Sequence, residues 1–590
     1  MFMHRLQFTR LYLVLLLVGG LSVACRRVPS SPSSLTPTLP TRSAAASETA
    51  SPTLIPPRVD TPRLSPTPTP MPTPTLTRTP TPTPLPRGGR VVEAGLAGIS
   101  TLNPLLVADD DDLSCAVGRL LFDGLLRVNP QTAALMPGLA RDWQASADGR
   151  TFTFHLRPGV TWHDGQSLSA ADVIFTLAVA GDPEGPSPYR FDLAGVREVT
   201  TPDRATVVVT FDEPGCDALY AVGRVPILPG HLLEGQAVAR SPFNRKPVGT
   251  GPFRFGSLEA DGSLVLNANE GYWAGRPRLD GWTYRLVPDM ASLRENLNLG
   301  RAHLARLPDG LPVASLPEVF HLLSYPAGWW HFLALNNDHP ALRDATVRRA
   351  LALALDRGRL LAVALDGQGT LMDAPWLATH WAMDGASLTP LVYAPDQARG
   401  LLAEAGWRDT DGDGLLDKDG QRLQVSISTN VGNPVRERIA LLVQQYWHVV
   451  GVSAQVETLP WGAFVDDLFQ HAFDVAVFDW PLEPGPDQSW LWSAGEDGPG
   501  TGFNFVSYAD PQADGLLKQG RTAPGCHPAR RAAAYRDLAQ RLAADQPYVF
   551  LFAAHRHLAV AKALAGPQPG PYGGLYWNIT DWYLEGSESP

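Results

Sequence analysis

Residues 152–165 read FTFHLRPGVTWHDG and residues 168–173 read LSAADV. Apolar side chains alternate with polar ones over residues 152–156, which is the period of a half-buried strand, and the Pro-Gly pair behind them predicts a turn. Ser169 has Asp172 three residues further on and an apolar run behind it, a spacing typical of a capping box at a helix start. The stretch therefore predicts a strand, a turn and then a helix.

The same string resembles the signature of the family 5 extracellular solute-binding proteins, the oligopeptide and dipeptide receptors of ABC importers. In that family an aromatic-rich strand ends in Leu-Arg-x-Gly-Val, continues into Trp-His-Asp-Gly and opens a helix at Ala-x-Asp-Val, and this order is found between residues 152 and 173. A plainer interpretation of Trp162, His163 and Asp164 is that they only pack against and cap a turn. The signature points to the family and not to the ligand contacts.

Further motifs extend the resemblance from residue 88 to about residue 582. They read LLFDGLLR at 120–127, MPGLARDW at 136–143, PVGTGPFRF at 247–255 and YWAGRPRLD at 272–280. Between them, a run of β-branched residues at 206–211 predicts a buried strand, and another strand is predicted to begin at Trp329. Four acidic residues at 109–112 precede an apolar stretch and predict the N-terminus of a helix.

The resemblance implies an α/β fold of the two-lobed periplasmic-binding-protein type (type II, cluster C), with an extra N-terminal subdomain and mixed sheets flanked by helices. The lobes of such proteins close on a solute by hinge motion. The implied boundaries place lobe I at 88–130, 245–325 and 550–590, the extra subdomain of lobe I at 131–244, and lobe II at 326–549.

Composition and motifs exclude some classes of function. The chain has 590 residues and a formal net charge of −11, which argues against a nucleic-acid partner, because such a partner demands a clustered basic surface. The sequence contains no Gly-x-Ser-x-Gly elbow, His-Glu-x-x-His motif or Walker loop, the motifs that mark several common hydrolase classes. We therefore expect a binding protein rather than an enzyme, with a secreted hydrolase as the alternative.

The N-terminal part has the composition of an export signal and a linker. Residues 1–24 combine basic residues with a short apolar run and predict a signal peptide. The run ends in LSVAC, similar to a bacterial lipobox, which implies lipidation of Cys25; a plain secretory peptide and an uncleaved anchor are the alternatives. Residues 25–87 are rich in Pro, Thr and Ser and predict a disordered stalk behind the lipidated residue. We expect an exported protein, anchored by lipid to the outer face of the cell membrane, or periplasmic.

The cysteine count limits covalent crosslinks. Lipidation of Cys25 would leave Cys115, Cys216 and Cys526. At most one disulfide can form among three thiols, and the sequence leaves the pairing open. No Cys-x-x-Cys pair occurs, which argues against a thiolate zinc site.

One loop has the spacing of a calcium ligand set. Asp409, Asp411, Asp413 and Asp417 stand at positions one, three, five and nine, with glycine at position six. In an EF-hand this spacing directs alternate carboxylates toward Ca²⁺. Position twelve holds Gly420 instead of the bidentate glutamate, so a plain acidic turn is the alternative. No other cofactor is expected.

The resemblance also implies ligand contacts in lobe II. In peptide-binding relatives an acidic residue three positions after a tryptophan meets the α-ammonium group of the ligand, and here Glu483 follows Trp480 at that distance. Such a carboxylate would form a charge-assisted hydrogen bond, and a solvated loop glutamate is the alternative. Trp330, Trp376 and Asn504 are further candidates for the wall of the cleft. For each tryptophan, a place in the hydrophobic core is the alternative.

The resemblance implies a receptor that captures an extracellular solute between two lobes and delivers it unchanged to an ABC permease in the membrane. Short peptides are the expected ligands, and oligosaccharides and metal chelates are alternatives on the same fold. A surface module for adhesion or signalling is a further alternative. We expect a monomer.

Overall fold

The computed structural model describes residues 85–108, 111–308 and 316–586. The predicted signal peptide, Cys25 and almost all of the predicted stalk lie outside the described residues, as do Asp109 and Asp110. Within the described ranges, no helix is both long enough and apolar enough to cross a membrane.

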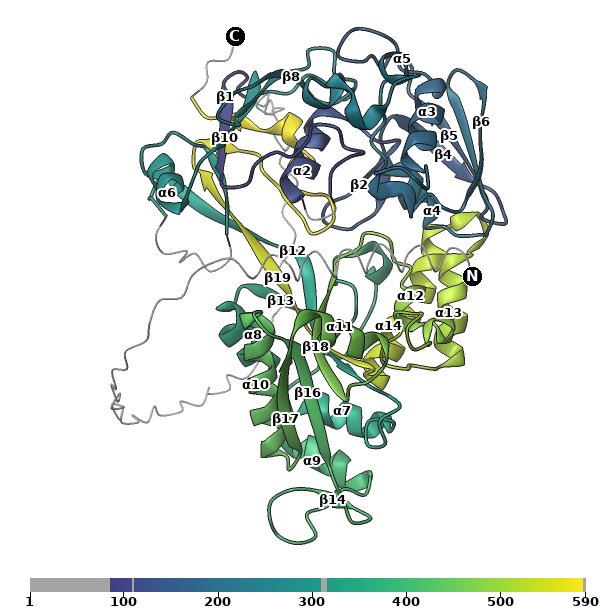
Figure 1. Cartoon of the computed structure of the whole chain (residues 1–590), viewed down its shortest axis with the longest axis vertical. Helices are drawn as coiled ribbons and strands as arrows, with labels where there is room; N and C mark the ends of the chain where they lie inside the picture. Colours follow the sequence, from purple (N-terminus) through teal and green to yellow (C-terminus); the bar gives the residue numbers. More distant parts are fainter. Residues whose placement is uncertain (1–84, 109–110, 309–315, 587–590) are drawn as a thin grey trace, which may run out of the picture. The chain divides into compact units, whose positions relative to one another are not determined.

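An 11-stranded mixed sheet runs through the described part of the chain (Figure 1). Its order is β17-β16-β18-β12-β19-β11-β1-β10-β9-β8, and β13 pairs with β19 off this path. The strands are β1 (Arg90–Gly95), β8 (Phe253–Leu258), β9 (Leu264–Ala268), β10 (Gly281–Leu286), β11 (Leu304–Leu307), β12 (Phe320–Leu335), β13 (Gly369–Leu371), β16 (Gln424–Asn430), β17 (Ser453–Leu459), β18 (Val475–Pro481) and β19 (Tyr548–Ala561).

Two long strands join the halves of this sheet. β12 and β19 pair antiparallel from Phe320 opposite Ala561 to Ala334 opposite Tyr548. At one end β19 pairs with β11, and at the other end β12 pairs with β18. Each strand therefore contributes to both halves, and the two strands lie side by side where the halves meet.

The start of β12 differs from the predicted one. The prediction that a strand begins at Trp329 was wrong, because β12 begins at Phe320. Pro326 and Gly328 break the pattern that indicates a strand in the sequence. The pairing with β19 nevertheless continues past them through a register shift between Pro326 and Trp330. A β-bulge of this kind accommodates residues that an ordinary ladder tolerates poorly.

A separate 4-stranded sheet contains the stretch that resembles the family signature. Its order is β4 (Ala140–Ala145), β5 (Thr151–Leu156), β7 (Thr206–Phe211) and β6 (Val196–Asp203). Alternate residues of β5 are buried. α3 (Ala170–Ala180) begins after Ser169, whose backbone N–H donates to the Asp172 carboxylate at 2.9 Å. The predicted strand, turn and helix and the predicted strand at 206–211 are confirmed.

Helices cover these sheets. α2 (Asp112–Leu121) begins after Asp111, whose carboxylate accepts the Ser114 backbone N–H at 2.9 Å. Asp111, the third residue of the acidic run, therefore caps a helix at the predicted place. The other helices are α4 (Ala218–Gly223), α5 (Gly230–Leu233), α6 (Met290–Asn298), α7 (Ala345–Leu353), α8 (Arg357–Leu365), α9 (Pro395–Glu404), α10 (Pro434–Val449), α11 (Trp461–Phe469), α12 (Ser489–Trp492), α13 (Pro511–Arg521) and α14 (Pro528–Asp545). Short hairpins are β2 (Leu126–Val128) with β3 (Leu135–Pro137), β14 (Asp417–Lys418) with β15 (Gln421–Arg422), and β20 (Leu564–Ala565) with β21 (Tyr583–Leu584).

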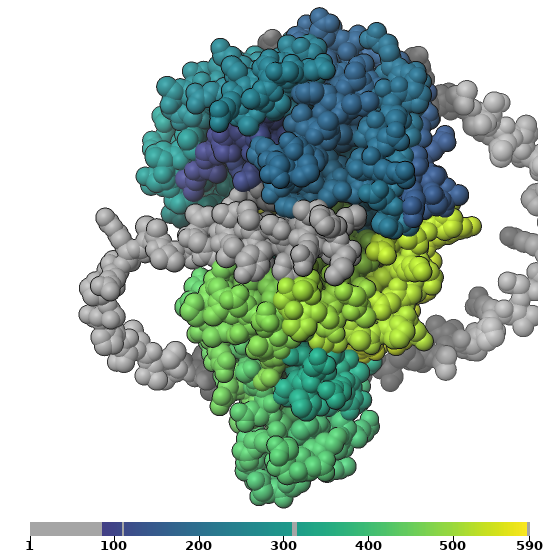
Figure 2. Space-filling view, turned by 45° about the vertical axis from the view of Figure 1, so that its right-hand side comes forward, coloured from purple at the N-terminus to yellow at the C-terminus, as the bar shows by residue number. Residues whose placement is uncertain are grey.

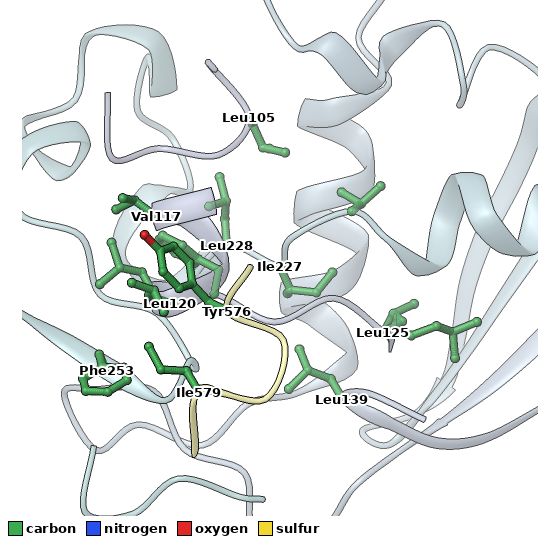
Figure 3. Packing of buried hydrophobic residues seen from close by; sticks show 14 of the residues in the cluster. Leu105, Val117, Leu120, Leu125, Leu139, Ile227, Leu228, Phe253, Tyr576 and Ile579 are labelled. Atoms are coloured by element: carbon green, nitrogen blue, oxygen red, sulfur yellow. The ribbon is translucent and has the colours of Figure 1, made fainter. Parts of the chain in front are cut away.

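One core holds the start and the end of the described chain together. Figure 3 shows Tyr576 and Ile579 beside Val117 and Leu120 of α2. The same core continues into the 4-stranded sheet through Phe152 and its neighbours. Cys526, in the 3₁₀ turn Pro524–Cys526 between α13 and α14, also packs into this core. We call the elements around this core, apart from that turn, the first lobe.

Two further cores lie on opposite faces of the other half of the large sheet. Phe332 and Phe478 belong to the core beneath α11–α14, whereas Leu333 and Val477, their neighbours in sequence, belong to the core beneath α7–α10. This alternation follows from the period of a strand. We call the elements around these two cores the second lobe. The residue boundaries predicted for the lobes and for the extra subdomain stay a prediction.

Candidate functional site

A disulfide joins the two lobes. Cys216, which lies between β7 and α4, is bonded to Cys526, which lies in a 3₁₀ turn (Pro524–Cys526) between α13 and α14. The Cα atoms are 5.3 Å apart and 310 residues separate the cysteines in the chain. Cys115 is free and exposed. The structure thus decides the pairing that the sequence left open.

Asp217, the residue after Cys216, is the centre of a polar network between the lobes. Its carboxylate pairs with Arg531 of α14 and accepts the backbone N–H of Asp487 at 2.8 Å. The Arg531 guanidinium lies 5.4 Å from the ring centroid of Trp381. The Trp381 indole N–H donates to the Tyr220 hydroxyl at 2.8 Å. Figure 2 shows the yellow-green surface that contains α13 and α14 directly against the blue surface of the first lobe.

Two carboxyl groups approach one another in this network. Burial, and then the neighbouring Asp217 carboxylate, raise the pKa of Asp487. The Asp487 carboxylate accepts the backbone N–H of Ser489 at 3.1 Å and the hydroxyl of the same residue at 2.5 Å. Carboxyl groups with perturbed pKa values are enriched in functional sites. The boundary between the lobes, around Asp217, Asp487 and Arg531, is therefore the candidate site that the structure adds.

Sequence reasoning missed these three residues. Asp217 and Arg531 are 314 residues apart in the chain and Asp217 and Asp487 are 270 residues apart, so no local pattern links them. A weak signal was the position of Asp217 directly after a cysteine, since a disulfide brings its flanking residues to the same place.

Trp330 and Trp480 lie inside the second lobe. Each is 1% exposed, and both belong to the core beneath α11–α14. The Trp480 indole N–H donates to the Tyr548 hydroxyl at 3.4 Å, and the ring of Phe332 stacks on that of Tyr548 at 4.1 Å between centroids. In this structure both tryptophans fill the core, and a role for them at the ligand stays a prediction.

The remaining predicted contacts are divided between this core, a loop and the surface. Trp376 belongs to the same core, and its indole N–H is buried without a hydrogen-bond partner in the described part of the chain. The Asn504 amide closes a local loop, because it donates to the Tyr508 carbonyl at 2.8 Å and accepts the N–H of that residue at 3.0 Å. Glu483 is exposed in the segment after β18. The ligand-binding role of all three stays a prediction.

A buried ion pair lies where β16 and β18 end. The Arg436 guanidinium donates to both oxygens of Asp479, at 2.9 and 2.6 Å, and to the Asn430 side chain at 2.7 Å. The imidazole of His331 is 3.3 Å from the same carboxylate. Burial by itself would raise the pKa of Asp479, but the Arg436 charge and the hydrogen bonds outweigh it and leave that pKa well below its usual value. This pair anchors the start of α10 to the carboxyl end of β18, an interior strand of the second-lobe sheet.

The acidic loop brings together three of its four predicted carboxylates. Asp409, Asp411 and Asp413 are exposed and offer oxygens within 4.8 Å of one another. The Arg422 guanidinium pairs with Asp413 and lies 4.0 Å from Asp417, and its positive charge competes with a cation there. The loop leads into the hairpin of β14 and β15, not into an EF-hand helix. The calcium hypothesis stays a prediction.

Comparison with known proteins decides the family. The family model of the bacterial extracellular solute-binding proteins, family 5 Middle, matches residues 134–502. The chain belongs to this family. The oligopeptide-binding protein AppA of Bacillus subtilis is 30% identical over 515 residues, which cover 84% of this chain and 92% of AppA. The dipeptide-binding protein of Escherichia coli is 26% identical, over 66% of this chain and 76% of its own length.

Solved structures of similar proteins establish the fold of this family 5 protein. AppA from Bacillus subtilis in complex with a nonapeptide has a TM-score of 0.58 at 28% identity, over 85% of this chain and 99% of AppA. HbpA2 from Haemophilus parasuis has a TM-score of 0.74 at 22% identity, over 84% of this chain and 100% of its own. The predicted family and the predicted two-lobed α/β fold, with mixed sheets flanked by helices, are confirmed.

Proposed function

We propose that this family 5 protein captures short peptides between its lobes and delivers them, unchanged, to an ABC permease. The observation that carries the proposal is the 30% identity to an oligopeptide-binding protein over 92% of that protein's length. A related solved structure, AppA, holds a nonapeptide. Receptors of this kind work by shifting a population from an open to a closed state, so no catalytic group is needed.

A metal chelate is the second candidate ligand. NikZ from Campylobacter jejuni, solved in complex with Ni(L-His), is 27% identical with a TM-score of 0.61, over 84% of this chain and 99% of its own. Calorimetry with a mixed panel of short peptides, Ni(L-His) and oligosaccharides separates the alternatives. Binding of peptides alone, with the peptides recovered intact, supports the proposal, whereas binding of only the chelate or a sugar, or cleavage of the peptide, contradicts it.

Glu483 is the proposed partner of the peptide α-ammonium group. We expect Glu483→Gln to weaken the affinity for a free peptide by about 10- to 100-fold, because a hydrogen bond to a charged group contributes about 1.5–3 kcal/mol. The exposed Glu457 on β17 provides a matched control, and Glu457→Gln should bind as the unaltered protein does. Calorimetry with a peptide and its N-acetylated form measures the effect. Equal loss for both forms, or no loss for either, would remove Glu483 from this role.

The proposed place of action is the outer face of the cell membrane, with Cys25 as the lipidated residue. The support is the LSVAC string at the end of an apolar run. We expect metabolic labelling with palmitate to mark the exported protein and to disappear in Cys25→Ala, because the diacylglyceryl group that carries the labelled acyl chains is attached to that sulfur. Label that persists in the variant would rule out this anchor.

A further inference from the structure

We propose that the Cys216–Cys526 disulfide, together with the Asp217–Arg531 ion pair, is a clasp that restricts how far the two lobes can separate. The disulfide supplies a covalent connection between the lobes in addition to the two strands β12 and β19. The inference rests on the proposed function in one respect, namely that a solute enters between the lobes.

Three of the four side chains of the clasp are shielded from water, and the fourth, Asp217, is 25% exposed. Cys216 is 0% and Cys526 is 6% exposed. The backbone N–H of Cys216 donates to the Arg521 carbonyl of α13 at 2.9 Å, and the Arg531 side chain is 3% exposed. Hydrogen bonds and ion pairs are stronger in such an environment than in water. The noncovalent contacts and the disulfide therefore connect the same two surfaces, one on each lobe.

The position of the clasp decides which motion it permits. In Figure 1, β12 and β19 cross between the lobes well apart from α13 and α14, which meet the first lobe next to α4. A rigid lobe that is fixed at two separate places can turn only about the line that joins them. Bending of β12 and β19 alone, which would separate the lobes at α13 and α14, is blocked as long as the disulfide is intact. The contacts of Asp217 with Arg531 and Asp487 are then kept in the open as well as in the closed state.

The test measures the distance between the lobes without ligand. Nitroxide labels are attached through maleimides at Glu234→Cys in the first lobe and Ala463→Cys on α11, both exposed positions, in the full chain with Cys25→Ser and Cys115→Ser. Electron–electron double resonance is then compared for the protein with the disulfide and for Cys216→Ser/Cys526→Ser. We expect the distances in the serine variant to shift to longer values and to spread more widely. Identical distance distributions would overturn the proposal.

Reduction provides a second route that does not depend on folding of the variant. The protein is labelled with its disulfide intact and then treated with a phosphine. The S–S bond is reduced to two thiols and the phosphine is oxidised to the phosphine oxide, with water supplying the oxygen of the oxide and the two thiol protons. We expect the same shift to longer distances, reversed when the thiols are reoxidised; no shift would contradict the clasp. Because no ligand is used, failure of this test is distinguishable from failure of peptide binding, which calorimetry reports separately.

Discussion

Replacing Arg436 with methionine is expected to lower the free energy of unfolding by about 3–5 kcal/mol, the range found when one partner of a buried ion pair is removed. The Arg436 and Asp479 side chains are 5% and 9% exposed, so the carboxylate that remains would be buried without the guanidinium, with only the His331 imidazole beside it. The guanidinium also packs 4.6 Å from the centroid of the Phe478 ring. Urea unfolding of the full chain measures the loss.

Two controls separate the charge from the packing. Arg399→Met removes the same groups from an ion pair whose side chains are 47% and 97% exposed, and we expect a loss of at most about 1 kcal/mol. Arg436→Met combined with Asp479→Leu removes both charges and should recover much of the stability. The explanation fails if the double variant is as unstable as Arg436→Met alone, because the loss then comes from packing.

The same pair predicts how stability depends on pH. The pKa of Asp479 is lower in the folded protein than its usual value, so the pair stabilises the fold above the pKa of the unfolded carboxyl group, about 3.9. As the pH falls below that value, this stabilisation is lost. In Arg436→Met the buried Asp479 carboxyl keeps only the His331 imidazole as a neighbouring partner. We expect its pKa to rise, so the variant should approach the unaltered protein in stability as acid is added. A difference that stays constant from pH 7 to pH 3 would contradict this reasoning.

Trp480→Ala is expected to destabilise the protein by about 3–5 kcal/mol, as large-to-small substitutions of buried aromatic residues do. Trp480 is 1% exposed. Its ring lies 5.1 Å from those of Phe478 and Trp490 and 5.7 Å from that of Phe505, measured between centroids. Truncation therefore leaves a cavity that rigid aromatic neighbours cannot fill.

A matched variant and a second measurement distinguish the core from the ligand site. Trp329 lies in β12, opposite Pro481 of β18, and is partly exposed, so Trp329→Ala should cost clearly less than Trp480→Ala. Trp480→Phe keeps most of the ring volume and should fold. If peptide affinity of Trp480→Phe is unchanged, Trp480 serves the core. If affinity falls while stability is kept, the predicted ligand contact is supported.

The sequence by itself determined the local elements and the family. The alternation in β5, the cap of α3 at Ser169 and Asp172, and the acidic cap of α2 depend on residues within a few positions of one another. The family could be recognised because its motifs are contiguous strings. The spacing of the acidic residues from Asp409 onward was equally visible in the sequence. Whether these carboxylates can bind a cation, however, depends on Arg422 and on the hairpin that follows.

Only the tertiary structure decided which distant residues meet and which side chains are buried. The sequence does not distinguish a tryptophan in a hydrophobic core from one in the wall of a ligand site. In the structure, Trp480 packs against Phe478, Trp490 and Phe505 and so lies in the core. The disulfide between Cys216 and Cys526 and the pair of Asp217 with Arg531 each join chain segments more than 300 residues apart. Contacts across such separations arise from the way the lobes pack, because the energies of burial and of ion pairing depend on how close two groups lie in space. Such contacts produce no periodic pattern in the sequence.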